Sequence, residues 1–403
     1  MTPVPIALRL APVLLAAFVV LNLAAAHAAE PRVAEALQPF VDRHALAGAV
    51  ALVAAPDKVL SVEVVGFSDV AKKTPMKADA LFWIASMSKP MTSTGLMMLV
   101  DEGKVHLDDP VAKYLPEFHG QMLVAEKTED RLVLKKPGHP ITVREILSHT
   151  SGLVARSPLE RELDSIPLRD ASISYGLSPL HFEPGSKYEY CNPGINTAGR
   201  IIEVVGGKPY EEFMQERLFG PLAMKDTTFW PNEEQLSRLA KSYKPNAEHN
   251  GLDEVPITQL SYPLTNRKRH PYPAGGLFST AADVATFCRM IANGGTLDGH
   301  RYVSESAVRQ MTSTQTGSLI NHGHGEGGYG LGWSTSRKSK GDSGPVIVGT
   351  CGHGGAYATS MSIEPDSHIV TVLMLQHAGF PPGVDGGKIH EAFVKAAKED
   401  LKK

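Results

Sequence analysis

The sequence predicts an α+β fold, in which an antiparallel sheet flanked by helices forms an α/β sandwich lobe and a mainly helical segment forms an inserted lobe. Two observations predict this. Strand-like segments lie near both ends of the chain, and helical segments broken by Gly and Pro turns fill the middle. Strands at both ends are expected to meet in one central sheet. We expect an α/β lobe from residues 29–105 and 270–403, a helical lobe from 106–269, and the functional site between them.

The α/β lobe is expected to begin with a helix, two strands and a second helix. The apolar periodicity predicts a helix over 33–44, strands over 49–54 and 59–65, and a helix over 87–102. Pro90 is tolerated because it lies in the first turn of that last helix. In the N-terminal part we therefore expect two strands followed by a helix.

The rest of the chain is expected to be helical first and strand-rich later. In the middle we expect helices over 143–147, 195–205 and 210–218. Towards the C-terminus the patterns predict a helix over 279–292, strands over 328–333, 346–349, 359–363 and 369–375, and a closing helix over 388–401.

The N-terminus has the pattern of a cleaved secretory signal peptide, residues 1–28. A single cation, Arg9, precedes an uncharged apolar stretch that closes on Ala26-His27-Ala28. A membrane anchor is the alternative, but the stretch contains Pro12 and Asn22 and a span needs about 20 predominantly apolar residues. We expect a secreted or periplasmic protein with no membrane span after cleavage.

Charge and cysteine content narrow the class of partner. The net charge is -3, with 40 basic and 43 acidic residues, so neither a nucleic-acid footprint nor an acidic tail is present. A small-molecule partner is expected, and the oligomeric state stays open. The three cysteines, Cys191, Cys288 and Cys351, are an odd number and fit no zinc spacing, so we expect three free thiols. No metal or other cofactor is predicted.

The first chemical motif is Ser86-Met87-Ser88-Lys89 at the start of a predicted helix. Residues three apart share a helix face, so Lys89 lies beside Ser86. A buried amine with a lowered pKa can take the proton of a serine hydroxyl, and the helix start offers backbone NH groups to an oxyanion. Taken alone the motif is weak, because a chain of this length holds about one or two by chance.

The second motif is Tyr190-Cys191-Asn192. In an extended segment Tyr190 and Asn192 point to one side, so a phenol and an amide face the same cleft. The phenol can pass a proton to a leaving group, and the amide can hold Lys89 or the substrate. A surface loop tyrosine is the alternative interpretation of the isolated triplet.

The third motif is His353-Gly354-Gly355, expected on the turn into the strand over 359–363. The glycines allow a substrate to approach the backbone, and the NH of Ala356 can complete an oxyanion hole. A second His-x-Gly begins at His377, and spacing alone does not decide between the two.

In this order and context the chain resembles the serine β-lactamase and penicillin-binding protein family. The branch it resembles has Tyr-x-Asn as second motif and includes class C β-lactamases, D-amino acid peptidases and family VIII carboxylesterases. Supporting stretches begin at Phe82, Leu107, Ile141, Ala274 and Tyr329, and include His149-Thr150-Ser151-Gly152-Leu153.

The resemblance implies a serine hydrolase that forms an acyl-enzyme. Ser86 is implied as the acylated nucleophile, Lys89 and Tyr190 as the proton-handling pair, Asn192 as support, and the NH groups of Ser86 and Ala356 as the oxyanion hole. The third motif departs from the Lys-Thr-Gly of class C β-lactamases, because His353 is mostly neutral near pH 7 and Gly354 has no hydroxyl.

That departure favours small neutral esters or amides over β-lactams and D-Ala peptides, which are anionic. A β-lactamase or D-Ala-D-Ala carboxypeptidase is the alternative, and a non-catalytic binding protein is a third. Two other segments are expected to have no catalytic or metal-binding role. The segment from His322 to Glu326 is interpreted as a surface loop and not as a metal site, and the segment from Glu160 to Asp164 is interpreted as a charged helix face.

Overall fold

An eight-stranded antiparallel sheet joins the two ends of the chain, in the order β12-β13-β14-β15-β16-β1-β2-β3. The computed structural model describes residues 32–317, 319, 327–338 and 347–401, which belong to one compact unit. The strands of the sheet are β1 (Gly48–Ala54), β2 (Val59–Asp69), β3 (Thr74–Pro75), β12 (Gly327–Tyr329), β13 (Ser334–Lys338), β14 (Ile347–Gly354), β15 (Ser360–Ile363) and β16 (Val370–Met374). This confirms the predicted α+β fold.

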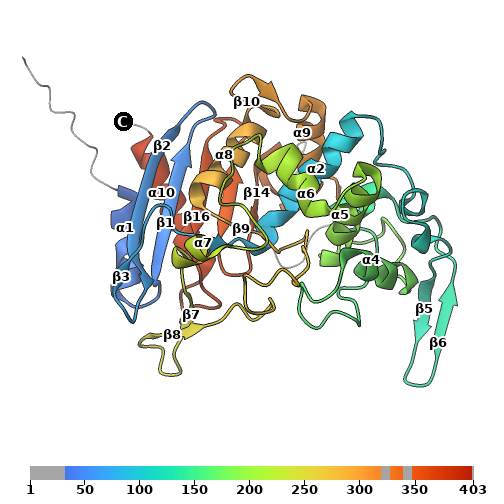
Figure 1. Cartoon of the computed structure of the whole chain (residues 1–403), viewed down its shortest axis with the longest axis horizontal. Helices are drawn as coiled ribbons and strands as arrows, with labels where there is room; N and C mark the ends of the chain where they lie inside the picture. The colour runs from blue at the N-terminus through green and yellow to red at the C-terminus, as the bar shows by residue number, and fades with distance from the viewer. Residues whose placement is uncertain (1–31, 318, 320–326, 339–346, 402–403) are drawn as a thin grey trace, which may run out of the picture. The chain divides into compact units, whose positions relative to one another are not determined.

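Strand β1 shows why the sheet is covered on both faces. All seven of its residues are buried, and successive side chains point to opposite faces. Val50, Leu52 and Ala54 join the core that contains α8 (Ala281–Ala292). The residues between them join a second core with α1 (Arg32–Asp42) and α10 (Gly386–Asp400). Figure 1 shows α1 and α10 on one side of these strands and α8 on the other.

Residues 88–237 supply most of the remaining helices. These are α2 (Ser88–Asp101), α3 (Val143–Ser148), α4 (Leu168–Leu177), α5 (Asn192–Gly206), α6 (Tyr210–Met214), continued by a π-helical turn (Gln215–Phe219), and α7 (Glu233–Ser237). Helix α2 is buried from Ser88 to Leu99 and packs against α5. Because α2 is enclosed on all sides, side chains at its start are held in fixed positions.

Several short elements complete the fold. They are η1 (Ala85–Met87), η2 (Val111–Lys113), η3 (Pro116–Phe118), α9 (Glu305–Thr312), and the paired strands β4 (Phe82–Trp83) with β9 (Phe278–Ser279), β5 (Leu123–Lys127) with β6 (Leu132–Lys135), β7 (Ser242–Pro245) with β8 (Leu252–Val255), and β10 (Thr296–Leu297) with β11 (His300–Arg301).

Two of these pairs, β5-β6 and β7-β8, lie within the segment expected to be mainly helical. The β5-β6 hairpin projects from the body of the molecule in Figure 1, and Leu132 and Leu134 on it are exposed. Its strands carry Lys and Glu and lack a clean apolar alternation, which explains why the sequence pattern did not indicate them.

The expected strand over 328–333 is shorter than predicted. Strand β12 ends at Tyr329, and Gly330 begins a turn in which its NH donates to the carbonyl of Trp333. Gly332 has φ +75°, and its NH donates to the carbonyl of Leu147 at 2.9 Å. The positive φ favours glycine at this position. The turn packs directly on helix α2, because a Cβ at Gly332 would meet the side chain of Ser93.

The segment from Glu160 to Asp164 is not the charged helix face that the sequence suggested. It contains no helix, and Asp164 is buried, with its carboxylate 2.6 Å from Nε of the equally buried Arg269. The same carboxylate accepts hydrogen bonds from the NH and hydroxyl of Ser261. Buried charges need such pairing, and the sequence spacing of the partners gave no signal of it.

The predicted helices and long strands otherwise lie where expected, with ends shifted by a few residues. Helix α8, for example, begins after Thr280, whose hydroxyl accepts a hydrogen bond from the NH of Asp283. The predicted leader, 1–28, and the segment from His322 to Glu326 lie outside the described residues. Within the described part of the chain, no helix has the length and apolarity needed to cross a bilayer.

The three cysteines are free thiols, as predicted, and all three are buried. Burial raises the pKa of Cys191 to about 11, so this thiol stays protonated near neutral pH. A protonated, buried thiol is a poor nucleophile. The chemistry of the adjacent motif therefore does not depend on Cys191.

Candidate active site

Ser86 lies in a strained turn at the start of helix α2. The preceding residue, Ala85, has φ +45°, a conformation that costs a non-glycine residue about 1–3 kcal/mol. The hydroxyl of Ser88 donates to the carbonyl of Ala85 at 2.6 Å and accepts from the NH of Leu277 at 3.3 Å. These contacts hold the turn that presents Ser86.

Lys89 contacts Ser86 directly, because the two side chains lie on one helix face. Its Nζ is 2.9 Å from Ser86 Oγ and 2.7 Å from the carbonyl oxygen of Ala274. The residue has no exposed surface, and burial lowers the pKa of Lys89 to about 7. A large fraction of the amine is therefore neutral near pH 7.5, which is the form able to accept the Ser86 proton.

Tyr190 lies over both groups. Its ring covers the Lys89 ammonium, with Nζ 4.8 Å from the ring centre, and its side chain hydrogen-bonds Ser86. Burial raises the pKa of Tyr190 above its usual range, so the phenol stays protonated and is a proton donor. Tyr190 is 36% exposed, so one edge of the ring is open to an incoming substrate.

Asn192 begins helix α5 and lies close to Tyr272, with which its side chain hydrogen-bonds. Its Oδ1 is buried without a hydrogen-bond partner among the described residues. The hydrogen bonds of Lys89 in that part of the chain go to Ser86 and Ala274, and none goes to Asn192. The backbone carbonyl of Ala274 therefore holds Lys89 where the Asn192 amide was one expected partner, and a contact of Asn192 with the substrate stays a prediction.

His353 and Gly354 are the last residues of strand β14, and not part of a turn as expected. The Nδ1 atom of His353 is 2.8 Å from the carbonyl oxygen of Gly354, so Nδ1 carries the proton and donates. Nε2 is 3.0 Å from the hydroxyl oxygen of Tyr329, with which it shares a hydrogen bond. The two contacts together fix the orientation of the His353 ring.

Gly355 and Ala356 follow in the turn between β14 and β15. A Cβ at Gly355 would lie 2.1 Å from Thr359 Oγ1 and 2.6 Å from the carbonyl oxygen of Ile84, so only glycine fits. This close approach brings the turn beside the segment that leads to Ser86. Among the backbone hydrogen bonds of the described residues, the NH groups of Ser86 and Ala356 donate none. Both are available to an oxyanion.

A cavity of about 490 Å³ brings these groups together. Its lining includes Ser86, Tyr190 and the four residues from His353 to Ala356. Lys89 lies behind Ser86 and Asn192 is not part of the lining. The described lining residues include no Lys or Arg. The cavity therefore offers a nucleophile, a proton donor and two backbone NH groups, and its described surface carries no fixed cation.

His149 is a site residue that the motif search did not identify. Its ring centre lies 4.4 Å from that of Tyr190 and 4.5 Å from that of Tyr329, and Nδ1 accepts the NH of Cys191 at 3.2 Å. Burial and the nearby Lys89 hold the pKa of His149 well below its usual value, so the ring is neutral. The stretch beginning at His149 supported the family resemblance, but the role of the His149 side chain depends on tertiary contacts that the sequence does not show.

The comparison with known families agrees with this geometry. Residues 33–394 match the family described as Beta-lactamase. The chain belongs to the Beta-lactamase family. The family comprises serine hydrolases that include esterases and peptidases, so the chain is a hydrolase of the β-lactamase fold.

Relatives in this family carry different activities in their names. Protein Rv1367c of Mycobacterium tuberculosis is 30% identical over 361 residues, covering 85% of this chain and 88% of its own. Esterase EstB of Burkholderia gladioli is 29% identical over 366 residues, covering 83% and 86%. Penicillin-binding protein 4 of Amycolatopsis lactamdurans is 30% identical over 300 residues, covering 73% and 72%.

Solved structures of the same fold include a hydrolase and a synthase. EstCE1, a hydrolase with promiscuous acyltransferase activity, superposes with a TM-score of 0.74 at 23% identity, covering 91% of this chain and 97% of that one. An unliganded simvastatin synthase from Aspergillus terreus gives 0.73 at 20% identity, covering 91% and 96%. At these identities the likeness concerns the fold.

Proposed function

We propose that this chain is an exported serine hydrolase that cleaves small neutral carboxylic esters or amides through an acyl-enzyme at Ser86. The observation that carries the proposal is the buried Lys89 amine 2.9 Å from Ser86 Oγ, with its pKa lowered to about 7. A base with a pKa near the working pH is the most effective at accepting a proton.

Acylation follows from the positions of three side chains. Ser86 Oγ attacks the carbonyl carbon of the ester while its proton passes to the neutral Lys89 amine. The carbonyl oxygen, now negative, accepts hydrogen bonds from the NH groups of Ser86 and Ala356. The carbon–oxygen bond to the alcohol then breaks, and Tyr190 donates its proton to the departing oxygen.

The catalyst is restored when Lys89 returns its proton to Tyr190. Deacylation repeats the sequence with water in place of the serine hydroxyl. Water adds to the acyl carbon and its proton passes to the Lys89 amine. The bond from the acyl carbon to Ser86 Oγ then breaks, Tyr190 protonates Ser86 Oγ, and Lys89 returns its proton to Tyr190. An alcohol acceptor in place of water would give acyl transfer by the same steps.

His149 supports the position of Tyr190 in this scheme. It packs on the Tyr190 ring, and its own orientation is fixed by the NH of Cys191. Because burial keeps His149 neutral, it adds no positive charge that would further lower the pKa of Lys89. His149 is thus a positioning residue, and it does not reach the reacting atoms.

The chemistry of the cavity surface supports the preference for neutral substrates. No Lys or Arg is among its described lining residues, and the His353 ring is held by the carbonyl of Gly354 and the hydroxyl of Tyr329. An anionic substrate would lose its hydration there without an opposite charge to offset the cost. A neutral ester avoids this cost.

The alternative is a β-lactamase or D-Ala-D-Ala carboxypeptidase. Its support is the similarity to proteins named for penicillin binding and D-alanyl-D-alanine carboxypeptidase activity, the latter from Escherichia coli at 26% identity. Both candidates use Ser86, so the distinction lies in the substrate and not in the nucleophile.

The deciding experiment compares purified protein on three substrates: a short-chain p-nitrophenyl ester, nitrocefin and a D-Ala-D-Ala peptide. We expect the highest kcat/KM for the ester. Lys89→Ala is expected to lower it at least about a hundredfold, whereas the exposed Lys104→Ala serves as the matched control. A higher kcat/KM for nitrocefin or the peptide would replace the leading proposal by the alternative. Cell fractionation, with sequencing of the mature N-terminus, tests export and cleavage after residue 28.

A further inference from the structure

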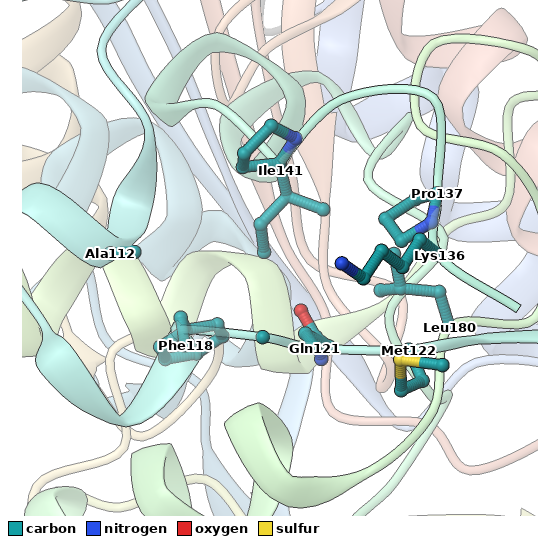
Figure 2. A pocket seen from close by; sticks show the side chains of 10 residues that line it. Ala112, Phe118, Gln121, Met122, Lys136, Pro137, Ile141 and Leu180 are labelled. Atoms are coloured by element: carbon teal, nitrogen blue, oxygen red, sulfur yellow. The ribbon is translucent and has the colours of Figure 1, made fainter.

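A second cavity, of about 260 Å³, shares no lining residue with the cavity at Ser86 (Figure 2). Its walls are largely apolar. Phe118, Ile141 and Leu180 contribute buried side chains, and the Leu180 NH donates to the carbonyl of Met122 at 2.7 Å, which fixes one wall. Such a lining suits an apolar chain or ring.

Gln121 places one unpaired acceptor at this cavity. Its Nε2 donates to the carbonyl oxygens of Tyr175 at 3.0 Å and Ser178 at 2.9 Å, so the orientation of the amide is determined. Its Oε1 is buried without a partner among the described residues, and in Figure 2 it lies on the side facing Ile141 and Lys136. A buried acceptor left unpaired is unfavourable, and a donor on a ligand would satisfy it.

Lys136 places a cation at the same cavity. It is exposed, and in Figure 2 its ammonium points across the space between Gln121 and Ile141. The neighbouring Lys135 is instead paired with Glu183, at 2.8 Å. Among the ion pairs of the described residues, Lys136 takes part in none. The cavity thus combines an apolar body, one acceptor and one cation.

We propose that this cavity binds a small amphipathic carboxylic acid. Its apolar body would lie between Phe118, Ile141 and Leu180, a hydroxyl or amide NH would donate to Gln121 Oε1, and its carboxylate would pair with Lys136. At about 30 Å³ for each water-sized group, the cavity holds about nine non-hydrogen atoms. The proposal goes beyond the hydrolase function, because the site does not involve Ser86.

Three related compounds test the ligand chemistry by isothermal titration calorimetry on the full chain. 4-Hydroxybenzoate has the ring, the donor and the carboxylate; benzoate lacks the donor, and 4-hydroxybenzamide lacks the charge. We expect 4-hydroxybenzoate to bind with Kd of about 1 mM or tighter. Each of the other two should bind at least about tenfold more weakly, a loss of about 1.4 kcal/mol.

Three variants test the location. Lys136→Gln should weaken 4-hydroxybenzoate binding about tenfold and leave 4-hydroxybenzamide binding unchanged, because only the first is charged. Lys135→Gln is the matched control and should change neither. Ala112→Leu should abolish binding by filling the cavity while both polar groups remain. All three should hydrolyse the p-nitrophenyl ester at the unmodified rate, so this test is independent of the Ser86 chemistry.

Several results would overturn the proposal. One is the absence of binding at millimolar concentration, which would mean that water alone satisfies Gln121. Another is equal affinity for the three compounds, or an equal effect of Lys135→Gln and Lys136→Gln. Binding that persists in Ala112→Leu but is lost after Ser86 is blocked by a fluorophosphonate would place the ligand in the cavity at Ser86 instead.

Discussion

The hydroxyl of Tyr329 lies 3.0 Å from Nε2 of His353, on the wall of the cavity that contains Ser86. Nδ1 of His353 donates to the carbonyl of Gly354, so the ring is held between two hydrogen-bond partners. Where the resemblance to class C β-lactamases implies a lysine, this chain has a hydrogen-bonded histidine.

The first prediction is therefore about charge selection. We expect kcat/KM for a neutral ester to exceed that for a β-lactam of similar size at least about tenfold, or about 1.4 kcal/mol of transition-state stabilisation. His353→Lys should narrow this ratio at pH 7.5 by adding a cation beside the cavity. The exposed His106→Lys is the control of equal charge. Hydrolysis of nitrocefin as fast as the best ester would show that the missing cation does not decide selection.

The second prediction is the pH dependence of acylation. Because burial lowers the pKa of Lys89 to about 7, the amine is protonated below that pH and cannot accept the Ser86 proton. The pre-steady-state acylation rate should rise with pH through about 7 and then level off. A flat profile between about pH 5.5 and 8.5 would contradict the role of Lys89 as base.

The third prediction is that Lys89 lowers stability in a pH-dependent way. Its folded-state pKa lies below the unfolded value of about 10.4, so between about pH 7 and 10 the unfolded chain binds the extra proton. The stability of the unmodified protein relative to Lys89→Met should rise with pH in that window, approaching about 1.4 kcal/mol per unit.

Urea unfolding of the two proteins at several pH values measures this difference, and other titrating groups cancel because both proteins contain them. Lys104→Met, at an exposed site, is the control and should show no such trend. A difference that stays constant across the window would mean that Lys89 is not held in an environment that disfavours its charge.

The sequence predicts those parts of the fold whose pattern lies within one short segment, and it does not predict contacts between segments that are far apart in the chain. The existence of β1 and β16 as strands follows from apolar runs that can be read directly, whereas their pairing with each other required the structure. The hairpin β5-β6 carries charged and exposed apolar residues with no clear period, and so gave no such signal. Asp164 could not be recognised as buried, because its partner Arg269 is 105 residues away.

The candidate site likewise contains contacts that the sequence predicts and contacts that only the structure shows. Ser86 and Lys89 share a helix face, and their contact follows from spacing alone. The carbonyl of Ala274 and the ring of His149 come from distant segments, so their contacts with Lys89 and Tyr190 required the tertiary structure. Asn192 was expected to hold Lys89 or the substrate; its side chain hydrogen-bonds Tyr272, a contact that sequence spacing does not indicate.

The fourth prediction concerns Gly332, which packs against the helix that carries Lys89. A Cβ there would lie 2.7 Å from Ser93 Cβ and 3.1 Å from the Lys89 carbonyl oxygen, at φ +75°. The positive φ alone is expected to cost about 1–2 kcal/mol when an alanine replaces Gly332. Gly332→Ala should lower the free energy of unfolding by more than this amount, and should lower kcat because it displaces Lys89.

Gly299→Ala provides the matched control for that variant. Gly299 has φ +79°, but no described heavy atom lies within 4 Å of the position that a Cβ would take, so the substitution carries the backbone cost without the clash. Thermal unfolding and ester kinetics should separate the two variants. Equal losses would show that the contact with α2 is unimportant.

The fifth prediction addresses the central claim, that Ser86 forms the acyl-enzyme. Protein mixed with a p-nitrophenyl ester, quenched in acid during turnover and digested, should yield the peptide containing Ser86 with the mass of one added acyl group. Ser86→Ala should show neither this adduct nor turnover, whereas the exposed Ser186→Ala should behave as the unmodified protein. An acyl group on any other residue, or full activity of Ser86→Ala, would contradict the account.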